Sequence, residues 1–506
     1  MKIFTATQIK KWDAFSITNE PIASIDLMER AATSCCNWLI GKNFGQKHLL
    51  IFCGKGNNGG DGLAIARLLL QHNCKATVYI LDPMAIGFGK TGTDEFQVNL
   101  ERLHECSTDI HFIQSPDFFP AIEESDIVID ALFGTGLNKS LDGIAAALVN
   151  YINSFNIPVI AIDMPSGLLA DSSSVGNTII EATYTLSFQN CKLAFLLPEN
   201  ENYCGDVHIL AIGLHKTFEQ KEETVFELMD KAIIKTIYHP RKKFANKGTY
   251  GHAALLSGSY GMMGAAVLSA RACLSSGVGK LTCYIPKCGY NILQTTAPEA
   301  MCIVSGDESI LSAQGIEKFD AVGIGPGIGL YPTNVNLLKE IFQAVKRPML
   351  IDADALNIIS QHKELFALIP AHSILTPHFK EFERLFGTAS NDIERLELAM
   401  RKSKEHNIYI IVKGHYSFIS SPDGKNYFNS TGNPGMAAAG SGDVLSGIIT
   451  ALLAQGYTPL HCCILGTYLH GLAGDIAAEK FSQEAMVAGD IVNSLGMAFK
   501  ELKVEG

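Results

Sequence analysis

The sequence predicts an α/β protein built on mostly parallel sheets with helices on both faces. Short apolar runs of strand length alternate with stretches of helical spacing from one end of the chain to the other. Several of these runs end directly in glycine or aspartate, as at Cys53-Gly54 and at Ile129-Asp130. Parallel strands bring such ends to one edge of a sheet, which is where ligands bind in this class of fold.

The composition and net charge of the chain exclude some classes of protein and argue against others. The chain has 506 residues, 47% hydrophobic and 18% charged, which predicts two or three packed domains and excludes a mainly disordered chain. The 40 Lys+Arg against 51 Asp+Glu give a formal charge of −11, which argues against a nucleic-acid partner. We find no apolar run of membrane-span length and no signal peptide, so we expect a cytoplasmic protein with no membrane partner. The 13 cysteines include no Cys-x-x-Cys motif, and we expect them to be buried and reduced. We also expect the protein to form a homo-oligomer.

The first half of the chain shows the α/β rhythm element by element. Its opening segment, Thr7 to about Thr33, has the pattern of two amphipathic helices, the second capped by Ser24, and is expected to pack as a lid on the first module. Helical spacing recurs at Leu63–Gln71 and Ile144–Ile152. Buried strands are expected at His48–Cys53, Ala76–Leu81, Asp126–Leu132, Pro158–Ile162 and Val207–Ile212.

The rhythm breaks between about Leu214 and Lys247, where the sequence becomes charged and then basic with a proline, and a domain boundary is expected there. We find no sequence repeat between the two halves, which predicts two unlike modules. The second series of strands is expected at His252–Ser257, Leu281–Ile285, Ala321–Ile324, Met349–Ile351, Ser373–Leu375 and Ile408–Val412.

A glycine-rich loop, Gly54 to Gly62, follows the first of these strands and precedes a helix expected to begin near Leu63. Glycines at this density let the backbone pass close to a ligand, and the amides at a helix start attract phosphate. Asn57, Asn58 and Asp61 add oxygens that suit a hard cation or ribose hydroxyls. The alternative is an ordinary tight turn from strand to helix.

Aspartates end two further strands of the first module. Asp130 closes one run before Ala-Leu-Phe-Gly134-Thr-Gly, and Asp163 closes the next before Met-Pro-Ser166-Gly. A charged carboxylate is a poor core residue unless it is solvated, paired or metal-bound, so both are expected to face a shared crevice. Either one alone could instead cap a helix.

These motifs, with the early Leu27-Met28-Glu29-Arg30-Ala31, make residues 1–214 resemble the NAD(P)H-hydrate epimerase family, which interconverts R and S epimers at C6 of the hydrated nicotinamide ring. The resemblance implies a three-layer Rossmann-like sandwich, a potassium ion at Asn58, Asp130 and Ser166, and Asp163 as substrate contact and general acid or base. Two interpretations of Lys139 are equally supported: it is a second catalytic group, or it is a solvated lysine without a catalytic role. The implied substrate contacts are Asn57, Asn58, Gly59, Gly60, Asp61, Gly134, Thr135, Gly136, Leu137, Asn138, Lys139, Ser140 and Asp163.

The strongest local signal in the chain runs from Asn433 to Asp443, with small residues leading into the apolar helix Val444–Ala454. Small residues uncover the backbone at a helix start, so several N–H groups can converge on a phosphoryl oxygen as it gains charge. Asp443 is expected to act beside this anion hole as a general base for a substrate hydroxyl. The alternative is that Asp443 only caps its helix.

Other chemistry-bearing residues cluster at strand ends in the second module. Gly323-Ile-Gly325-Pro-Gly327 follows one strand, and Asp352 and Asp354 follow the next. Thr376-Pro-His378 and Lys413-Gly-His follow two more. Taken singly, His378 would more often be structural, but its neighbours favour a functional role.

With Lys247-Gly-Thr-Tyr-Gly and Gly258-Ser-Tyr-Gly-Met-Met-Gly264, these motifs make residues 240–506 resemble the ribokinase-like superfamily and, within it, the nucleotide-dependent NAD(P)H-hydrate dehydratases. The resemblance implies hydrate contacts at Ala265, Gly327, His378 and Asp443. It implies nucleotide contacts at Lys413, Gly414, His415, Tyr416, Ser417, Phe418, Gly440, Ser441 and Gly442. A Mg2+ ion is expected at the nucleotide phosphates, and fused chains of this kind favour ADP as donor.

The sequence therefore predicts a bifunctional repair enzyme for NADHX and NADPHX, the hydrates of NADH and NADPH. The predicted domains are an epimerase domain at 1–214, a linker at 215–245 and an ADP-dependent dehydratase domain at 246–506. One alternative keeps the second fold as a kinase acting on a vitamin-precursor alcohol, because an anion hole with an aspartate base serves any hydroxyl. Another alternative makes the first module a non-catalytic binding or RNA-associated scaffold. The asparagines and aspartates of the first module and the net negative charge of the chain argue against it.

Overall fold

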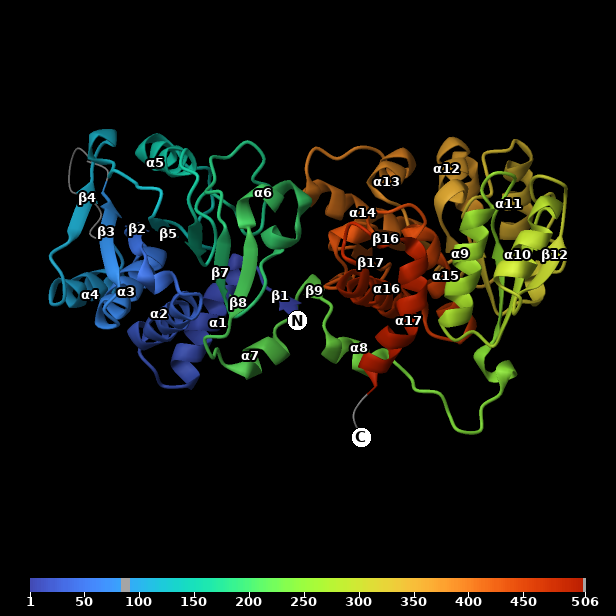
Figure 1. Ribbon diagram of the computed structural model, residues 1–506, viewed down its shortest axis with the longest axis horizontal. Helices are drawn as coiled ribbons and strands as arrows, with labels where there is room; N and C mark the ends of the chain where they lie inside the picture. The colour runs from blue at the N-terminus through green and yellow to red at the C-terminus, as the bar shows by residue number, and fades with distance from the viewer. Residues whose placement is uncertain (83–91, 504–506) are drawn as a thin grey trace. The chain divides into compact units, whose positions relative to one another are not determined.

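The chain folds into two compact units in a computed structural model that describes residues 1–82 and 92–503. One unit comprises Met1–Thr224 with Asn391–Ile393, and the other Val225–Ser390 with Glu394–Gly506. Figure 1 colours the first unit from blue to green and the second from green to red. Each unit has its own sheet and its own hydrophobic core.

The first unit is a three-layer sandwich around a sheet in the order β4-β3-β2-β5-β6-β7-β8, and every neighbouring pair in this order is parallel. The strands of this sheet are β2 His48–Cys53, β3 Lys75–Leu81, β4 Ile110–Ile113, β5 Ile127–Ala131, β6 Val159–Ile162, β7 Tyr184–Phe188 and β8 Asp206–Leu210; the short strand β1 Lys2–Ile3 is not part of it. The helices of this unit are α1 Ala6–Asn19, α2 Ser24–Gly41, α3 Asn57–Gln71, α4 Asp94–His104, α5 Gly143–Asn153, α6 Glu201–Cys204 and α7 Lys216–Lys221.

Strand β2 shows why this sheet is covered on both faces. Leu49 and Ile51 pack in a cluster with residues of α2, α3 and α4, whereas Leu50 and Phe52 pack with residues of α5. Successive side chains of a strand point to opposite faces, so an uninterrupted apolar run requires helices on both sides.

The second unit has a sheet whose strands follow the order β9-β18-β17-β16-β15-β14-β13-β10-β11-β12. The pairs β16–β17 and β17–β18 are antiparallel, and the other pairs are parallel. The strands are β9 Phe226–Leu228, β10 His252–Leu256, β11 Lys280–Ile285, β12 Met301–Val304, β13 Ala321–Ile324, β14 Leu350–Ile351, β15 Ile374–Leu375, β16 Tyr409–Val412, β17 Phe418–Ser420 and β18 Asn426–Phe428.

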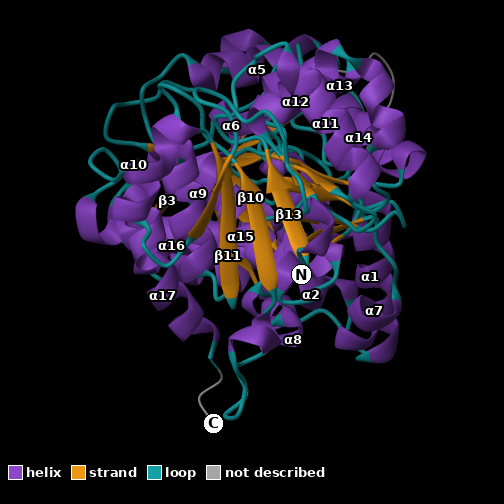
Figure 2. Ribbon diagram, turned by 90° about the vertical axis from the view of Figure 1, so that its right-hand side faces the viewer, coloured by secondary structure: helices purple, strands orange, loops and turns teal. Residues whose placement is uncertain are grey.

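Helices lie on both sides of this second sheet, as Figure 2 shows. On one face, Ala253 and Leu255 of β10 pack with Ala266 and Ala270 of α9 and with Ala451 of α15. The helices are α8 Lys231–Ile237, α9 Met263–Ser275, α10 Tyr290–Thr296, α11 Thr333–Ala344, α12 Ala353–Gln361, α13 Phe379–Phe386, α14 Asp392–His406, α15 Ser441–Ala454, α16 Pro459–Phe481 and α17 Ala488–Leu502.

Each sheet has a switch point at which the chain reverses its direction of travel across the strands. In the first unit the chain moves from β2 to β3 and β4 and returns to β5 on the other side of β2. In the second it moves from β10 to β11 and β12 and returns to β13 on the other side of β10. Loops that leave the two strands at such a point diverge and open a crevice, so the loops after β2, β5, β10 and β13 are placed to bind ligands.

The α/β class and the parallel sheets are confirmed, but several local expectations are wrong. Helix α3 begins at Asn57 rather than near Leu63, so the expected loop is largely the first two turns of a helix. Ser24 does not cap α2: the helix begins at Ser24, and the hydroxyl of Ser24 donates to Glu95 Oε1 at 2.7 Å. Cys106 is exposed, and Cys74, Cys288 and Cys302 are half-buried, so not every cysteine is buried.

The segment that was expected to be a linker has secondary structure of its own. Residues 215–245, expected to be a linker, contain α7, β9 and α8, and β9 pairs with β18 in the second sheet. Among the described residues, no helix has the length and apolar character that a membrane crossing requires.

Candidate functional site

The loop after β2 and the first turn of α3 form the floor of the first site. A Cβ placed on Gly59 would lie 1.7 Å from the carbonyl oxygen of Gly54, so the backbone here is too close for any side chain. The first-turn amides of a helix have no intrahelical acceptor. The amides of Asn57, Asn58 and Gly59 are therefore available to an anionic group, whereas that of Gly60 donates to the carbonyl of Gly56 at 3.0 Å.

Asn58 and Asp163 meet beside the loop that follows β5. A Cβ placed on Gly134 would lie 2.8 Å from Asp163 Oδ2 and 3.3 Å from Asn58 Oδ1, so glycine leaves the space between them open. The amide of Asn58 is buried and has no hydrogen-bond partner among the described residues. Of the following residues, Gly136, Asn138, Lys139 and Ser140 are exposed, and Thr135 and Leu137 are half-buried.

The carboxylate of Asp163 is fixed by three donated hydrogen bonds. Thr135 donates to Oδ2 from both its backbone nitrogen and its hydroxyl, each at 2.9 Å. Lys192 Nζ lies 3.0 Å from Oδ1. Burial acts to raise the pKa of Asp163, but the Lys192 ammonium and the Thr135 hydrogen bonds outweigh it and lower the pKa below its usual value. Asp163 has a φ of 64°, a strained conformation that is typical of functional positions.

Asp130 lies fully buried next to Ser166. It accepts hydrogen bonds from Ser166 Oγ at 2.6 Å, Ser166 N at 2.8 Å and Leu132 N at 3.2 Å. Burial raises the pKa of Asp130 to about 6, although the hydrogen bonds from Ser166 oppose the rise. A buried carboxylate without a cationic hydrogen-bond partner, together with the orphaned amide oxygen of Asn58, suits a hard monovalent cation.

Two residues of this site carry no motif in the sequence. Lys192, 1% exposed, also donates to Ser187 Oγ at 2.6 Å and to the carbonyl of Phe188 at 3.0 Å. A lone lysine inside the apolar run Cys191–Leu197 was the available signal. Asp13 of α1 interacts electrostatically with Asp163 and Lys192, and burial followed by Asp163 raises its pKa to about 7. Lys139 makes no hydrogen bond or ion pair with any described residue and no pair with Asp163.

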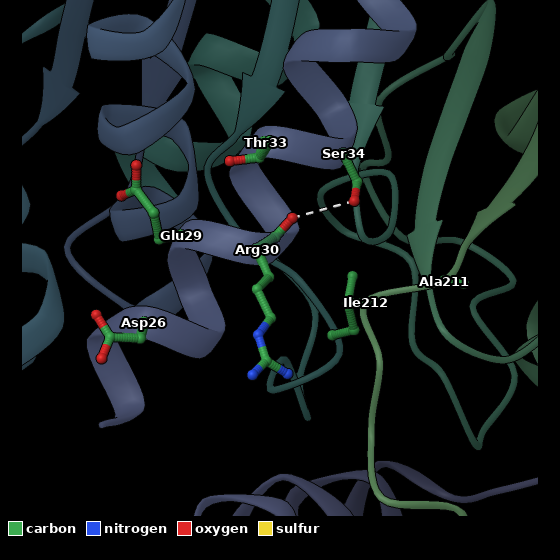
Figure 3. Close-up of a pocket in the computed structure, with 7 residues that line it drawn as sticks. All are labelled: Asp26, Glu29, Arg30, Thr33, Ser34, Ala211 and Ile212. Atoms are coloured by element: carbon green, nitrogen blue, oxygen red, sulfur yellow. Dashed lines mark hydrogen bonds between the residues drawn. The ribbon is translucent and has the colours of Figure 1, made fainter. Parts of the chain in front are cut away.

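An open groove of about 540 Å³ in the first unit is separate from these residues. Figure 3 shows its lining residues, which come from α2 and from the end of β8. Glu29 is bound by Arg67 at 2.7 Å, and Arg30 by Glu20 at 3.0 Å. These charges already have protein partners, and the groove shares no residue with either predicted site. Its lining residues are Asp26, Glu29, Arg30, Thr33, Ser34, Ala211 and Ile212.

The second site centres on the first turn of α15. Gly440, at a φ of 90°, is the residue before the helix, and a Cβ there would lie 2.5 Å from Leu268 of α9. The amides of Gly442 and Asp443 belong to the first turn and have no intrahelical acceptor. Asp443 is the third helical residue and not the cap, and it forms no side-chain hydrogen bond with the described residues. The alternative that Asp443 only caps its helix is therefore wrong.

A buried ion pair lies beneath this helix start. Lys413 Nζ lies 2.9 Å from Asp352 Oδ1 and 3.9 Å from Glu381 Oε2, and Ser446 Oγ donates to Asp352 Oδ2 at 2.5 Å. A Cβ on Gly442 would lie 3.3 Å from Lys413 Nζ, which places the ammonium directly against the helix start. Burial favours the neutral amine, but Asp352 and Glu381 outweigh it and raise the pKa of Lys413.

This environment prepares Asp443 to exchange a proton near neutral pH. Burial and then Asp352 raise the pKa of Asp443 to about 7, while Lys413 acts to lower it. A carboxyl with a pKa near the working pH is suited to general acid–base catalysis.

Two of the predicted hydrate contacts, Ala265 and Gly327, lie at the switch point of the second sheet. Gly327 has a φ of 63°, and a Cβ there would lie 2.9 Å from Ala265 Cβ. Leu268, which touches Gly440, lies one helical turn beyond Ala265, so these loops and the start of α15 share one edge. His378 precedes α13 and accepts from Lys380 N at 3.1 Å through Nδ1. Its Nε2 lies 3.6 Å from Glu381 Oε1, and the side chain is half exposed, so the ring edge is accessible to a ligand.

The predicted nucleotide segment runs from the end of β16 into β17. Gly414 and His415 are exposed, and Tyr416 and Ser417 are half-buried. Phe418 is buried against Phe428, with ring centroids 5.0 Å apart, so only its backbone is open to a ligand. Ser441 Oγ lies 3.2 Å from Nε2 of His470, which carried no sequence signal and whose pKa is lowered by burial to about 4.

Comparisons with known proteins match the whole chain. A family model described as NAD(P)H-hydrate dehydratase matches residues 253–496, and one described as YjeF-related protein N-terminus matches residues 24–194. A bifunctional NAD(P)H-hydrate repair enzyme from Moorella thermoacetica is 35% identical, over 100% of this chain and 98% of the relative. One from Escherichia coli is 31% identical, over 89% of this chain and 84% of the relative.

Solved structures match a little more than half of the chain. An ADP/ATP-dependent NAD(P)H-hydrate dehydratase from Bacillus subtilis, co-crystallised with ATP and Mg2+, is 26% identical with a TM-score of 0.48, over 55% of this chain and 98% of that one. A ribokinase-like superfamily protein from Enterococcus faecalis is 28% identical with a TM-score of 0.49, over 56% of this chain and 98% of that one.

Proposed function

Because this chain belongs to the bifunctional NAD(P)H-hydrate repair enzyme family, we propose how its two units divide the repair. The first unit epimerises the R and S hydrates at C6 of the nicotinamide ring. The second dehydrates the S form in a nucleotide-dependent reaction. We assign epimerisation to residues 1–214 and dehydration to residues 246–506, with 215–245 between them, in a cytoplasmic homo-oligomer.

In the second unit, Asp443 takes the proton of the C6 hydroxyl, and the hydroxyl oxygen then attacks the terminal phosphoryl group of ADP. The amides of Gly440 to Gly442 receive the negative charge that develops on the phosphoryl oxygens. The Lys413 ammonium, 3.3 Å from a Cβ position on Gly442, adds positive charge below them. AMP is the product of this transfer.

Elimination follows because phosphate is a far better leaving group than hydroxide. The lone pair of ring N1 expels phosphate from C6, and loss of a C5 proton forms the C5–C6 double bond of NADH or NADPH. Among the described residues, no three His, Cys, Asp or Glu side chains lie together as ligands of one metal ion. We expect Mg2+ to be bound by the nucleotide phosphates, where it would offset their negative charge.

In the first unit, epimerisation proceeds by loss of the C6 hydroxyl as water and return of water to the opposite face. Asp163 contacts the substrate and takes part in proton transfer. The amides at the start of α3 and the open loop from Gly134 to Ser140 bind phosphate and ribose. Potassium would be bound by Asn58, Asp130 and Ser166, where its charge would offset the buried carboxylate and orient the loops around it.

The observation that carries this proposal is the second site. A carboxyl with a pKa of about 7 stands in the first turn of a helix whose amides are open, beside a buried ammonium. That combination supports a base that activates a hydroxyl next to an acceptor of phosphoryl charge.

Two variants test the division of labour. Asp443→Asn should abolish nucleotide-dependent recovery of the dihydropyridine absorbance and leave exchange between epimers intact. Asp163→Ala should abolish exchange between the epimers and leave nucleotide-dependent recovery from the S hydrate intact. Loss of both activities in either folded variant would refute the two-site assignment.

A further inference from the structure

Lys192 is a buried lysine whose role the proposed reaction leaves open. Its side chain is 1% exposed, although an ammonium group is costly to bury unless it is paired and hydrogen-bonded. Its Nζ donates to Ser187 Oγ at 2.6 Å and to the carbonyl of Phe188 at 3.0 Å, and it lies 3.0 Å from Asp163 Oδ1. An ammonium group has three hydrogens, so these three acceptors use all of them and fix its position.

The acceptors of Lys192 lie at the ends of two neighbouring strands. Ser187 and Phe188 are the last two residues of β7, and Asp163 directly follows β6, which pairs with β7 in parallel. The backbone nitrogen of Asp163 donates to the carbonyl of Leu186, also in β7, at 2.8 Å. The end of β7 therefore holds Asp163 twice: directly through the backbone, and through Lys192 at the carboxylate.

Lys192 also determines which part of the Asp163 carboxylate is left for a ligand. A carboxylate offers about four acceptor positions, two on each oxygen. The backbone nitrogen and the hydroxyl of Thr135 both donate to Oδ2, each at 2.9 Å, and so occupy that oxygen. Lys192 takes one position on Oδ1, and the described residues donate to no other position there. The remaining acceptor position of Asp163 is therefore on the oxygen that Lys192 fixes.

Two further features show that Asp163 depends on such support. Its φ of 64° is a strained backbone conformation, and strain of this kind persists only where the surrounding contacts enforce it. Burial acts to raise the pKa of Asp163, and the Lys192 ammonium is the largest of the influences that lower it. Without the ammonium, the carboxylate would lose both its fixed direction and the charge that compensates it.

Resting on the proposed epimerase function, we propose that Lys192 is the positioning residue of the first site, which aims the open acceptor position of Asp163 Oδ1 at the substrate. Lys192 does not itself touch the substrate, because its three hydrogens are donated within the protein. Its influence on proton transfer at C6 passes through Asp163 alone.

Lys192→Met in the full chain tests this proposal, because methionine has a similar length and no charge. Formation of the S hydrate from the R hydrate is followed without nucleotide by separating the epimers, and the spontaneous rate is subtracted. We expect kcat to fall about a hundredfold or more, because a positioned proton-transfer group contributes about 10²–10⁴-fold. KM for the R hydrate should be unchanged, because the proposed phosphate and ribose contacts are on α3 and on the loop after β5.

Lys2 offers a matched control in the same unit. Its Nζ also has three acceptors, the backbone carbonyls of Glu219, Gln220 and Glu222, at 2.8, 3.3 and 2.6 Å. None of them belongs to the first site. Lys2→Met therefore removes an ammonium that is equally well hydrogen-bonded, and it should keep the wild-type kcat and KM for exchange between the epimers.

Thermal unfolding separates the loss of position from the loss of the fold. Lys192→Met leaves the charge of Asp163 buried without its partner, so the unfolding temperature should fall. The double variant Asp163→Asn/Lys192→Met removes both charges and should recover most of that loss, because the two substitutions act on one contact. It should remain without epimerase activity. A double variant that folds where Lys192→Met alone does not would support the proposal in the same way.

Several results would contradict the proposal. One is a wild-type kcat in folded Lys192→Met, and another is a raised KM with kcat unchanged. A loss of kcat larger than that of Asp163→Asn would show that Lys192 acts on something besides Asp163, and a double variant less stable than Lys192→Met would show that it supports the fold independently. A wild-type chain that converts the R hydrate no faster than the spontaneous rate would instead refute the epimerase function itself.

Discussion

Two aspartates of this chain show how environment sets the role of one side-chain type. Asp163 accepts from an ammonium and from two Thr135 donors, so its pKa is lowered. Asp443 has no hydrogen-bond partner among the described residues and lies near Asp352, so burial and that charge raise its pKa to about 7. The first is a fixed charge, and the second is a group that can change its protonation near neutral pH.

This difference predicts the pH dependence of the dehydratase. A base must be ionised to act, so the rate from the S hydrate should rise with pH through about 7 and be lost below it. Lys413 lowers the pKa of Asp443, so Lys413→Gln should move the rise to higher pH in whatever activity is left. The measurement is kcat/KM from the S hydrate between pH 5 and 9. A flat profile would contradict the role of Asp443.

At the same scale, the sequence predicted the residues that end strands and missed those that come from elsewhere. Asp130 and Asp163 were predictable because a carboxylate at the end of a buried apolar run has to be compensated. Asp443 was predictable from the small residues that uncover the backbone at a helix start. Lys192 was not, because its partners appear only once β6 and β7 are paired.

At the scale of elements, strands with uninterrupted apolar runs were predicted well. β2 and β13 were predicted with both of their bounds, and β10 within one residue. β7 was not predicted, because Thr185 and Ser187 interrupt its apolar pattern; both are buried, and Thr185 donates to the carbonyl of Cys204 at 2.7 Å. β17 and β18 have three residues each, too few for periodicity to be read.

The close turn between β2 and α3 gives a prediction at this scale. Gly59→Ala should cost the first unit about 1–3 kcal/mol and most of its epimerase activity, because the added methyl would lie 1.7 Å from the Gly54 carbonyl oxygen. Gly41→Ala, whose methyl meets nothing within 4 Å, is the matched control. Thermal unfolding and the rate from the R hydrate measure the effect. If the two variants had the same unfolding temperature and the same rate from the R hydrate, the turn would tolerate a side chain at Gly59, which would contradict the prediction.

In the molecule as a whole, two units of unlike sequence share one kind of architecture. Each has a mostly parallel sheet with a switch point, and in each the loops at that point carry some of the predicted ligand contacts. The two sets of contacts differ in chemistry: carboxylates around a buried lysine in the first unit, and an open helix start with a carboxyl of raised pKa in the second. We propose that this difference lets one chain perform both proton transfer at C6 and phosphoryl transfer to the oxygen on the same carbon.

The most direct test of this account is the product balance of the purified chain incubated with the R hydrate, ADP and Mg2+. The account predicts one AMP and one free phosphate for each NADH formed, with the R hydrate fully consumed. Accumulation of a stable phosphoester without NADH would contradict it and would identify a kinase instead.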